Sequence, residues 1–478
     1  MSVQPNSATS SSAPKALVIG SSGNIGRAAT QYLMDSGIDV VAADYNDEAN
    51  KNALSSINKK QGEITFAQID ATNISSITET IKQHNPDIVI STLPPGQLSY
   101  NAAFASAHER TTYVSSNFLT ESAEADLNTL TSQQTDGEHT SFDEYVTAQG
   151  VASEWGKGLD PGLDFWLFES AIEDFKDGEI YKLTSTGAGI SEDPKDMYIY
   201  TWAGITNGMG HRPASIIRDG EQINIDGREK FSDENRQDID HLTLHDGTHI
   251  ETYANDDGIF KLLEHAENLG IDLDHIEVAA TLTGRHQGHC ETWDPLVRQL
   301  DILNNDDTYA VDATFADVLE SRLAKTDTSP VKLAVDSEVF RSIPLKSGKD
   351  NPTAKDIVED HLSKVYARED GKRDRSVIHI EVEGRTALGE YKEKSLEINS
   401  YGSPHLDGFT SMQKTVAGTL VESARQLIQI STEAGLQSTR SANVDPDIVF
   451  ENMLEKDLIT LSEQNSSQQP DFHQRAEP

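Results

Sequence analysis

Cysteine, basic residues and long apolar runs are all scarce in this sequence. Its 478 residues include one cysteine, Cys290, so neither a disulfide within the chain nor a zinc site built from cysteines is expected. Its 39 Lys and Arg residues stand against 79 Asp and Glu residues, a formal charge of −40. Because nucleic acids and anionic membranes are bound by basic surfaces, neither is an expected partner. No apolar run approaches the roughly 18 residues of a membrane-spanning helix.

The ends of the chain are polar. Residues 1–13 are rich in Ser, Ala and Pro, and residues 462–478 in Gln, Ser and Pro, so both are predicted to be disordered tails. The N-terminal segment lacks the basic and apolar regions of a secretion signal, and with the single cysteine this favours a cytoplasmic protein. The acidic residues are spread along the whole chain, which indicates a strongly solvated surface or, alternatively, adaptation to a high-salt cytoplasm.

Strand and helix patterns alternate over the first third of the chain. Short apolar runs typical of strands buried on both faces occur at 16–19, 39–43, 64–69, 87–92 and 112–114. Helical patterns lie between them at 24–36, 48–58, 74–84 and 100–109. This alternation predicts an α/β domain of the Rossmann type over residues 14–157, a doubly wound parallel sheet. The acidic stretch at about 120–155 is expected to contain a surface insertion.

Beyond Trp155 the alternation becomes irregular. Strand patterns occur at 180–184, 276–282 and 377–382, and helical patterns at 165–175, 260–269 and 354–367. Strands and helices without regular alternation predict a second, α+β domain over residues 158–405. A long amphipathic helix is predicted at 411–433.

A glycine-rich loop, residues 20–26, joins the first strand to the first helix. In that position glycines allow a tight turn and close approach of the backbone to a pyrophosphate, which the helix N-terminus also attracts. The alternative is a tight turn without a ligand. The loop residues expected to bind the cofactor are Gly20, Ser22, Gly23, Asn24 and Ile25.

Asp44 ends the second strand about 20 residues after the glycine loop, where an acidic side chain accepts hydrogen bonds from the adenosine ribose. A carboxylate there repels a 2′-phosphate, and no arginine occurs at 45–50, so NAD is favoured over NADP. The alternative is an exposed aspartate at the end of a strand. The ends of the next two strands are expected to border the adenine (Asp70, Ala71) and the nicotinamide (Ser91, Thr92, Leu93, Pro94). None of the 13 tyrosines is followed by lysine four positions later, which argues against a short-chain dehydrogenase.

Several segments resemble the saccharopine dehydrogenase family. The segment 158–164, GLDPGLD, is similar to a Gly-Leu-Asp-Pro-Gly-x-Asp segment of that family. Further similar segments, in the same order along the chain, are 91–94, TYVSSN at 112–117, Trp202, PASIIRDG at 213–220, GHCE at 288–291 and GFTSMQKTVAG at 408–418. The chain departs from the family at Phe165, where a histidine is frequent, and after Trp202, where an acidic residue or arginine is missing.

This resemblance implies an NAD(P)-dependent oxidoreductase that acts on the C–N bond of a small-molecule amino-acid substrate. It implies that residues 158–405 bind the substrate and form a homodimer, and that a helix within 406–435 returns to the Rossmann domain. A lysine 6-dehydrogenase and a carboxynorspermidine-type dehydrogenase are alternatives within this class. A dinucleotide-binding protein without catalytic activity is an alternative outside it.

Five polar residues are candidates for the substrate site. Asp160 and His289 are the catalytic candidates, because a histidine titrates near neutrality and an aspartate can orient an amine. Arg212, Arg285 and Asp164 are the candidates for substrate binding, because a guanidinium binds a carboxylate bidentately. The alternatives are an Asx turn for the aspartates, a surface salt bridge for Arg212 and a buried helix-capping role for His289. The histidines show no H-E-x-x-H spacing, so no metal site is predicted.

Overall fold

The computed structural model divides the chain into two compact units. The first comprises the chain up to Leu163 together with Gln413–Leu458, and the second comprises Asp164–Met412 and the chain from Ile459 onward. The structure describes residues 13–57, 61–192, 202–210, 212–324, 350–365, 370–405, 408–429 and 432–467. Residues 1–12 and 468–478 of the two predicted tails lie outside the described residues.

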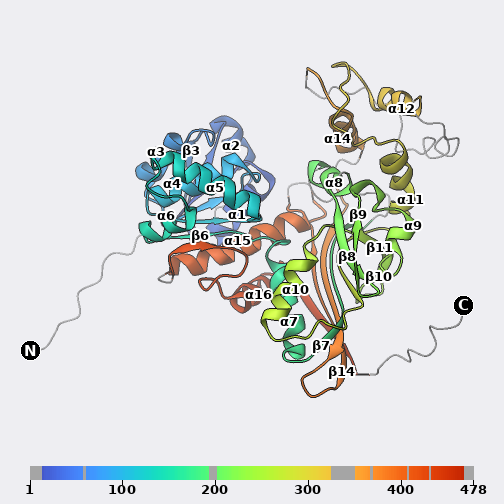
Figure 1. Ribbon diagram of the computed structural model, residues 1–478. Helices are drawn as coiled ribbons and strands as arrows, with labels where there is room; N and C mark the ends of the chain where they lie inside the picture. Colours follow the sequence, from blue (N-terminus) through green and yellow to red (C-terminus); the bar gives the residue numbers. More distant parts are fainter. Residues whose placement is uncertain are drawn as a thin grey trace, which may run out of the picture. The chain divides into compact units, whose positions relative to one another are not determined.

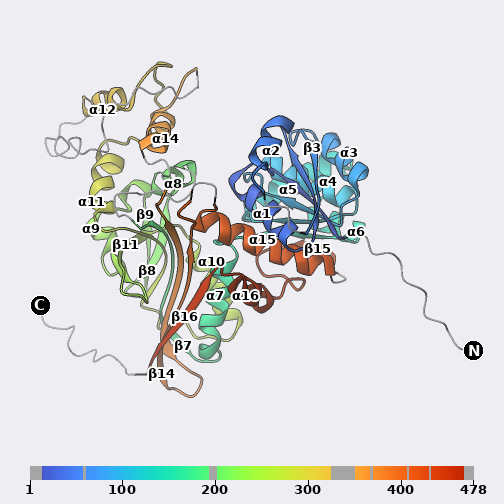
Figure 2. The ribbon, with the colours of Figure 1, turned by 180° about the vertical axis from the view of Figure 1, so that it is seen from behind.

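The first unit is built on a parallel sheet of seven strands, in the order β15-β6-β5-β4-β1-β2-β3. Its elements are β1 Lys15–Ile19, α1 Asn24–Asp35, β2 Asp39–Asp44, α2 Asp47–Ala53, β3 Ile64–Gln68, α3 Ile74–His84, β4 Ile88–Ser91, α4 Gln97–His108, β5 Thr112–Ser115, α5 Glu121–Gln134, α6 Phe142–Gln149, β6 Ala152–Glu154, α15 Ser411–Gln429, β15 Gly435–Gln437 and α16 Pro446–Glu455. The predicted Rossmann-type fold is therefore confirmed. Helices α3, α4, α5 and α6 lie on one face of the sheet (Figure 1), and α1 and α15 lie on the other (Figure 2).

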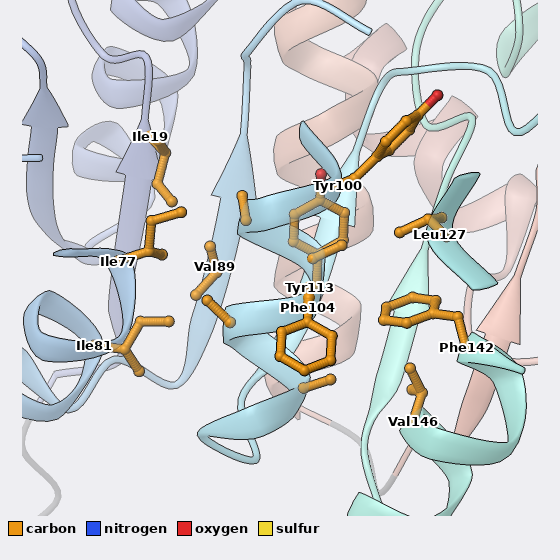
Figure 3. Close-up of a cluster of buried hydrophobic side chains, with 14 of the residues drawn as sticks. Ile19, Ile77, Ile81, Val89, Tyr100, Phe104, Tyr113, Leu127, Phe142 and Val146 are labelled. Atoms are coloured by element: carbon orange, nitrogen blue, oxygen red, sulfur yellow. The ribbon is translucent and has the colours of Figure 1, made fainter. Parts of the chain in front are cut away.

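A hydrophobic core lies between this sheet and helices α3 to α6. Ile19 of β1, Val89 of β4 and Tyr113 of β5 are buried there together with side chains of those helices. Figure 3 shows Ile77 and Ile81 of α3 beside Ile19 of β1 and Val89 of β4. Both sheet faces are covered, which is why the strands are almost continuously apolar.

The stretch at 120–155 differs from the surface insertion expected there. It forms α5 and α6, and Leu127, Phe142 and Val146 of these helices belong to the buried core (Figure 3). Apolar side chains that recur every three or four residues form one buried stripe on each helix. The acidic residues occupy the remaining surface, so the composition of the segment hides the buried stripe.

The second unit contains a mixed sheet of nine strands. Seven follow the order β10-β11-β12-β7-β13-β14-β16, with β8 paired to β12 and β9 paired to β8. Its elements are α7 Leu163–Ile172, η1 Glu173–Phe175, β7 Glu179–Ser191, α8 Trp202–Met209, β8 Ala214–Arg218, β9 Glu221–Ile225, η2 Gly227–Glu229, α9 Asp233–Arg236, β10 His241–Thr243, β11 His249–Ala254, α10 Ile259–Asn268, β12 Val278–Arg285, α11 His289–Asp294, η3 Pro295–Gln299, α12 Phe315–Leu323, α14 Ala354–Val365, β13 Asp374–Arg385, β14 Tyr391–Tyr401 and β16 Thr460–Ser466. Helices α7 and α10 lie side by side (Figures 1 and 2), with Phe165 and Phe168 of α7 against His265 of α10.

The last strand, β16, overlaps the C-terminal tail that was predicted to be disordered from residue 462. Residues 460–466 pair antiparallel with β14, and Ser462 lies opposite Glu397. An edge strand can carry polar side chains on its solvent-facing side, so a Gln- and Ser-rich composition does not exclude pairing. No helix in the described part of the chain has the length and apolar character needed to cross a membrane.

Candidate functional site

The glycine loop is fixed to the second strand by its own backbone. Gly20 has φ +86°, a left-handed conformation that favours glycine. The N–H groups of Gly20 and Ser21 donate to the carbonyl oxygen of Ala43 at 3.0 and 3.2 Å. The Ser21 hydroxyl also contacts this carbonyl and the side chain of Asn50, which in turn donates to Ala42. The loop is therefore held at the carboxyl end of β2 before any ligand binds.

The N-terminus of α1 is suited to an anion. Its N-cap residue is Gly23, which has no side chain that could cap the helix, and the first turn contains no acidic residue. By contrast, Asn46 caps α2 and Asn73 caps α3 with their side chains. Uncapped N–H groups and the positive end of the helix dipole attract anions such as phosphate. A Cβ at Gly23 would lie 3.1 Å from the Gly20 carbonyl oxygen, so a larger side chain would crowd this cradle.

Asp44 lies directly beside this loop. Its Oδ2 accepts hydrogen bonds from the Ser22 N–H at 3.1 Å and the Ser22 hydroxyl at 2.7 Å, and its Oδ1 accepts from the Tyr45 N–H at 2.8 Å. The carboxylate thus stands at the end of β2, beside the glycine loop, where an adenosine ribose lies in folds of this type. The residues present fit a nicotinamide dinucleotide at the pyrophosphate and at the ribose.

The other predicted cofactor residues end the neighbouring parallel strands and therefore share one edge of the sheet. The Thr92 hydroxyl donates to the carbonyl oxygens of Ile19 and Gly20, both at 3.0 Å, so it supports the glycine loop. The carbonyl of Leu93 accepts from Asn117 Nδ2 at 3.1 Å. Ser91 is buried and Pro94 is exposed.

At the end of β3, Asp70 accepts hydrogen bonds from the hydroxyl and the N–H of Thr72 at 2.6 and 2.9 Å. These bonds hold the pKa of the Asp70 carboxyl below its usual value. The carbonyl of Ala71 accepts from Asn101 of α4 at 3.0 Å. Thr72 and Asn101 therefore fix the segment expected to border the adenine.

The GLDPG segment forms a tight turn before α7. The Gly158 N–H donates to Pro161 O at 2.9 Å, and the Leu163 N–H donates to Gly158 O at 3.1 Å. Asp160 is exposed at the tip of this turn, and Asp164 is partly buried in the first turn of α7. The turn holds both carboxylates in defined places, but their roles remain predictions.

Arg212 lies near a buried lysine that the sequence did not single out. Its Nη2 contacts Asp256 Oδ2 at 2.9 Å, and 57% of its side chain is exposed. Lys230 is fully buried and donates to the carbonyls of Gly208 and Asn255. Burial, reinforced by the nearby charge of Arg212, lowers the pKa of Lys230 to about 8. No motif marks this lysine, because its environment comes from segments distant in sequence.

Arg285 and His286 end β12 close to α11. Arg285 is buried and its Nη1 donates to Gly284 O at 2.8 Å. The His286 Nε2 lies 2.7 Å from Ser191 O at the end of β7. The charges of Arg285 and His286 reach His289, the first residue of α11. The structure therefore places Arg285 close enough to His289 for its charge to lower the histidine's pKa.

His289 is enclosed by aromatic rings. It stacks on Tyr253 at 6.0 Å between ring centroids, and Phe231 and Trp293 contact it at 5.9 and 6.2 Å. The imidazole is 5% exposed, and neither nitrogen has a hydrogen-bond partner in the part of the chain that the structure describes. Burial and, secondly, the charge of Arg285 hold its pKa well below 6.5, so the ring is neutral at pH 7.

Glu251 of β11 is a further residue that sequence patterns did not reveal. Its two carboxylate oxygens accept from the N–H groups of Gly288 and Cys290 at 2.8 and 2.9 Å. A carboxylate at a helix N-terminus stabilises the helix, so Glu251 fixes the start of α11 and with it His289. Cys290 is buried and burial raises its pKa to about 12, which is consistent with packing rather than thiolate chemistry.

Comparisons with known proteins agree with this arrangement. Residues 158–456 match the family model of the saccharopine dehydrogenase C-terminal domain, and residues 16–132 match that of the NAD dependent epimerase/dehydratase family. The second match is confined to the parallel-sheet unit. The Tyr-x-x-x-Lys pair is absent from the sequence.

Three proteins illustrate the similarity. The chain is 25% identical over 305 residues to mitochondrial alpha-aminoadipic semialdehyde synthase of Mus musculus and 24% identical over 300 residues to that of Rattus norvegicus. These alignments cover 58% and 57% of the chain but 31% of each relative, so the chain spans about a third of the relatives' length. The apo structure of saccharopine dehydrogenase (L-Glu forming) from Saccharomyces cerevisiae matches 95% of the chain and 100% of its own, with a TM-score of 0.71 and 19% identity.

The family resemblance seen in the sequence is therefore confirmed at two levels. The solved structure matches 95% of the chain, which at this identity shows the fold. The C-terminal family model covers more than half of the chain, from the GLDPG turn to α16. The chain belongs to the saccharopine dehydrogenase family.

Proposed function

We propose that this protein is an NAD-dependent oxidoreductase that acts on the C–N bond of an amino acid. The observation that carries the proposal is the uncapped glycine loop with Asp44 bonded to Ser22 at its side, in a chain of the saccharopine dehydrogenase family. A nicotinamide dinucleotide, when bound, supplies the hydride chemistry. The chain's own residues bind the cofactor, orient the substrate and hold protons.

Within this proposal, the N–H groups at the start of α1 bind the pyrophosphate and Asp44 accepts hydrogen bonds from the ribose hydroxyls. NAD is proposed over NADP because Asp44 would face a 2′-phosphate with like charge. Tyr45, the next residue, is 71% exposed and offers no positive charge to a phosphate. The cofactor preference thus depends on one carboxylate.

For the substrate, we propose that Arg212 and Arg285 bind carboxylates and that Asp164 and Asp160 orient the amine. The Asp256 carboxylate already neutralises Arg212 in part, so a substrate carboxylate there competes with an existing ion pair. Arg285 is buried, and in a site of lower dielectric its attraction for a carboxylate is stronger. We therefore expect Arg285 to contribute more to substrate affinity.

His289 is the proposed proton acceptor, since its low pKa keeps it in the neutral, accepting form at pH 7. Its aromatic enclosure equally supports a packing role. Kinetics of a His289→Asn variant separate the two roles. Proton transfer predicts a fall in kcat and loss of a limb of the pH–rate profile, and packing predicts a lower melting temperature with an unchanged profile.

The proposed function is tested by supplying NADH or NADPH with a panel of amino acids and oxoacids or aldehydes, and by following the nicotinamide absorbance. Consumption of NADH with one amine–carbonyl pair, with formation of a secondary amine, supports the proposal. In a parallel assay with NAD⁺ in place of the reduced cofactor, oxidation of lysine with release of ammonia and formation of NADH would identify the lysine 6-dehydrogenase alternative. Binding of NADH without turnover on any pair would identify a non-catalytic dinucleotide-binding protein.

Two further assignments are proposals. A homodimer is proposed from the family resemblance, and sedimentation equilibrium tests it. A cytoplasmic location is proposed because Cys290 is a buried free thiol, as is usual in reducing compartments. The two curated relatives are named as mitochondrial proteins, so fractionation of the source cells has to decide the location.

A further inference from the structure

Two histidines and a glutamate converge on one face of the mixed sheet of the second unit. His379 of β13 and Glu397 of β14 lie directly opposite each other in the antiparallel register. His245 lies in the turn between β10 and β11, and its backbone N–H donates to Glu397 Oε2 at 2.9 Å. One nitrogen from each histidine and one carboxylate oxygen lie within 4.8 Å of one another. In the sequence, Glu397 lies 152 residues from His245 and 18 residues from His379, so no short sequence motif contains all three.

The distances suit coordination of one small cation. His379 Nδ1 lies 3.2 Å from Glu397 Oε2. Two donors on a tetrahedral Zn²⁺ ion, each at about 2.0–2.1 Å, stand about 3.4 Å apart. This pair can therefore bind one ion without displacement of the backbone. His245 is only partly buried, so its ring can complete the set by a small rotation.

The surrounding groups act as outer-shell partners for such ligands. The two nitrogens of His245 lie 2.7 Å from the Ser462 hydroxyl and 2.8 Å from the Ser395 hydroxyl. Whichever nitrogen binds a metal, the other keeps a serine partner, and this second bond orients a metal-binding histidine. Glu397 Oε1 accepts from Asn399 at 2.8 Å and from Arg375 at 3.3 Å, so Oε2 is the oxygen that faces the histidines.

The local charge also favours a cation. Glu397 is fully buried and His379 is 3% exposed. Arg375 is paired with Asp246 at 2.7 Å as well as with Glu397, so two carboxylates share one guanidinium. The group therefore combines two imidazoles with a carboxylate whose charge is balanced only in part, by a guanidinium that also pairs with Asp246.

We propose that His245, His379 and Glu397 bind a divalent transition-metal ion such as Zn²⁺, with solvent as the fourth ligand. Imidazole and carboxylate together are typical ligands of Zn²⁺. The ion ties the β10–β11 turn to β13 and β14. This site is independent of the proposed cofactor loop, and it differs from the sequence-based prediction of no metal site.

A second carboxylate group in the sheet provides a matched control. Glu381, Glu383 and Glu393 also place three oxygens within 4.8 Å of one another, but Lys182 contacts two of them at 2.9 and 3.2 Å. This group has no nitrogen ligand, and the ammonium group of Lys182 already pairs with two of its carboxylates. We expect it to bind no transition metal under the same conditions.

The test is titration of the full-length chain, untagged and stripped with a chelator, with Zn²⁺ in a calorimeter and with Co²⁺ followed by visible absorption. We expect one ion per chain with a Kd of about 1 μM or tighter, and a Co²⁺ band typical of nitrogen and oxygen ligands in low coordination. His245→Gln, which retains a side chain able to bond the serines, is expected to weaken binding by about a hundredfold. Glu393→Gln and His241→Gln, the latter at an exposed histidine, are expected to bind as tightly as the wild type.

The proposal is overturned if the chain binds no Zn²⁺ at stoichiometric concentration, which would make the group an ion-free hydrogen-bond network. It is overturned equally if His245→Gln binds as tightly as the wild type, which would place the ion elsewhere. Circular dichroism of each variant shows whether it is folded. Should His379→Gln fail to fold, His245→Gln still decides, because His245 lies in a turn and is partly exposed.

Discussion

At the scale of single residues, Gly23 and Gly26 of the glycine loop have different tasks. A Cβ at Gly26 would lie 2.2 Å from the Gly20 carbonyl oxygen, whereas one at Gly23 would lie 3.1 Å from the same atom. Gly23 also has φ −68°, which other residues adopt freely. Gly26 is therefore required for the close packing of α1 on the loop, and Gly23 leaves space beside the proposed pyrophosphate site.

We therefore predict that Gly23→Val lowers NADH affinity by about a hundredfold, about 2.7 kcal/mol, while the melting temperature changes little. Gly26→Val is predicted to destabilise the fold by about 1–3 kcal/mol, because a backbone atom cannot yield to the new side chain. Quenching of tryptophan fluorescence by NADH and thermal unfolding measure the two effects. Unchanged NADH affinity in Gly23→Val would remove this loop from the cofactor site.

His289 gives a prediction on pH. Its pKa is lowered in the folded state, so below about pH 6.5 the unfolded state binds a proton that the folded state does not. The free energy of unfolding therefore falls as the pH falls, by up to about 1.4 kcal/mol per pH unit from this one group. In His289→Leu this part of the pH dependence disappears. The pKa values of His84 and His245 are also lowered, but these two residues contribute the same pH dependence to the wild type and to the variant.

Urea unfolding at about pH 7.5 and about pH 5.5 measures the difference between the two proteins. We expect the wild type to lose about 1 kcal/mol more than His289→Leu over this interval. Parallel losses would mean that His289 becomes protonated in the folded protein, and hence that water reaches the aromatic enclosure.

At the scale of elements, the last strand of the parallel sheet is attached by a buried ion pair. Lys157 and Glu154 are both fully buried, with Nζ 3.2 Å from Oε2. Lys157 Nζ also donates to the carbonyls of Ser438 and Thr439, which follow β15. Lys157→Met is predicted to cost about 3–5 kcal/mol of stability, because it leaves a buried carboxylate without its cation.

A double variant separates charge from shape at this pair. Glu154→Gln added to Lys157→Met removes the uncompensated charge and keeps the Oε1 bonds to Ser441 and Asn443. We expect the double variant to regain about half of the lost stability in urea unfolding. If the double variant is less stable than Lys157→Met, the carboxylate is stabilised by its neutral partners and not by the lysine.

The elements also show which parts of the structure can be predicted from the sequence. Strands β1 to β5 and their helices were predictable because each is marked by its own apolar run and by a local stop signal. β14 was not, because its charged residues become acceptable only through partners elsewhere, such as Arg375 and His379 around Glu397. The candidate site divides in the same way. Glycine spacing and Asp44 are local signals, whereas Lys230 owes its burial to distant segments.

At the scale of the whole molecule, the dominant property is the charge of −40. Like charges destabilise a compact state through self-repulsion, and salt screens them, since the Debye length falls from about 10 Å at 0.1 M to about 3 Å at 1 M. We predict that the melting temperature rises by about 5–10 °C when KCl is raised from about 0.1 M to about 1 M. Differential scanning calorimetry measures it, and a flat or falling melting temperature would contradict adaptation to a high-salt cytoplasm.

The central claim is that the glycine loop and Asp44 form an NAD site. Titration of the wild type with NADH and with NADPH at matched ionic strength tests it most directly. We predict that NADH binds at least about tenfold more tightly, about 1.4 kcal/mol, because the Asp44 carboxylate accepts from ribose hydroxyls and repels a 2′-phosphate. Asp44→Ser with Tyr45→Arg is predicted to reverse the preference, since the exposed position 45 can carry an arginine toward the phosphate. NADPH bound as tightly as NADH by the wild type would contradict the claim, because Asp44 could then not lie at the ribose.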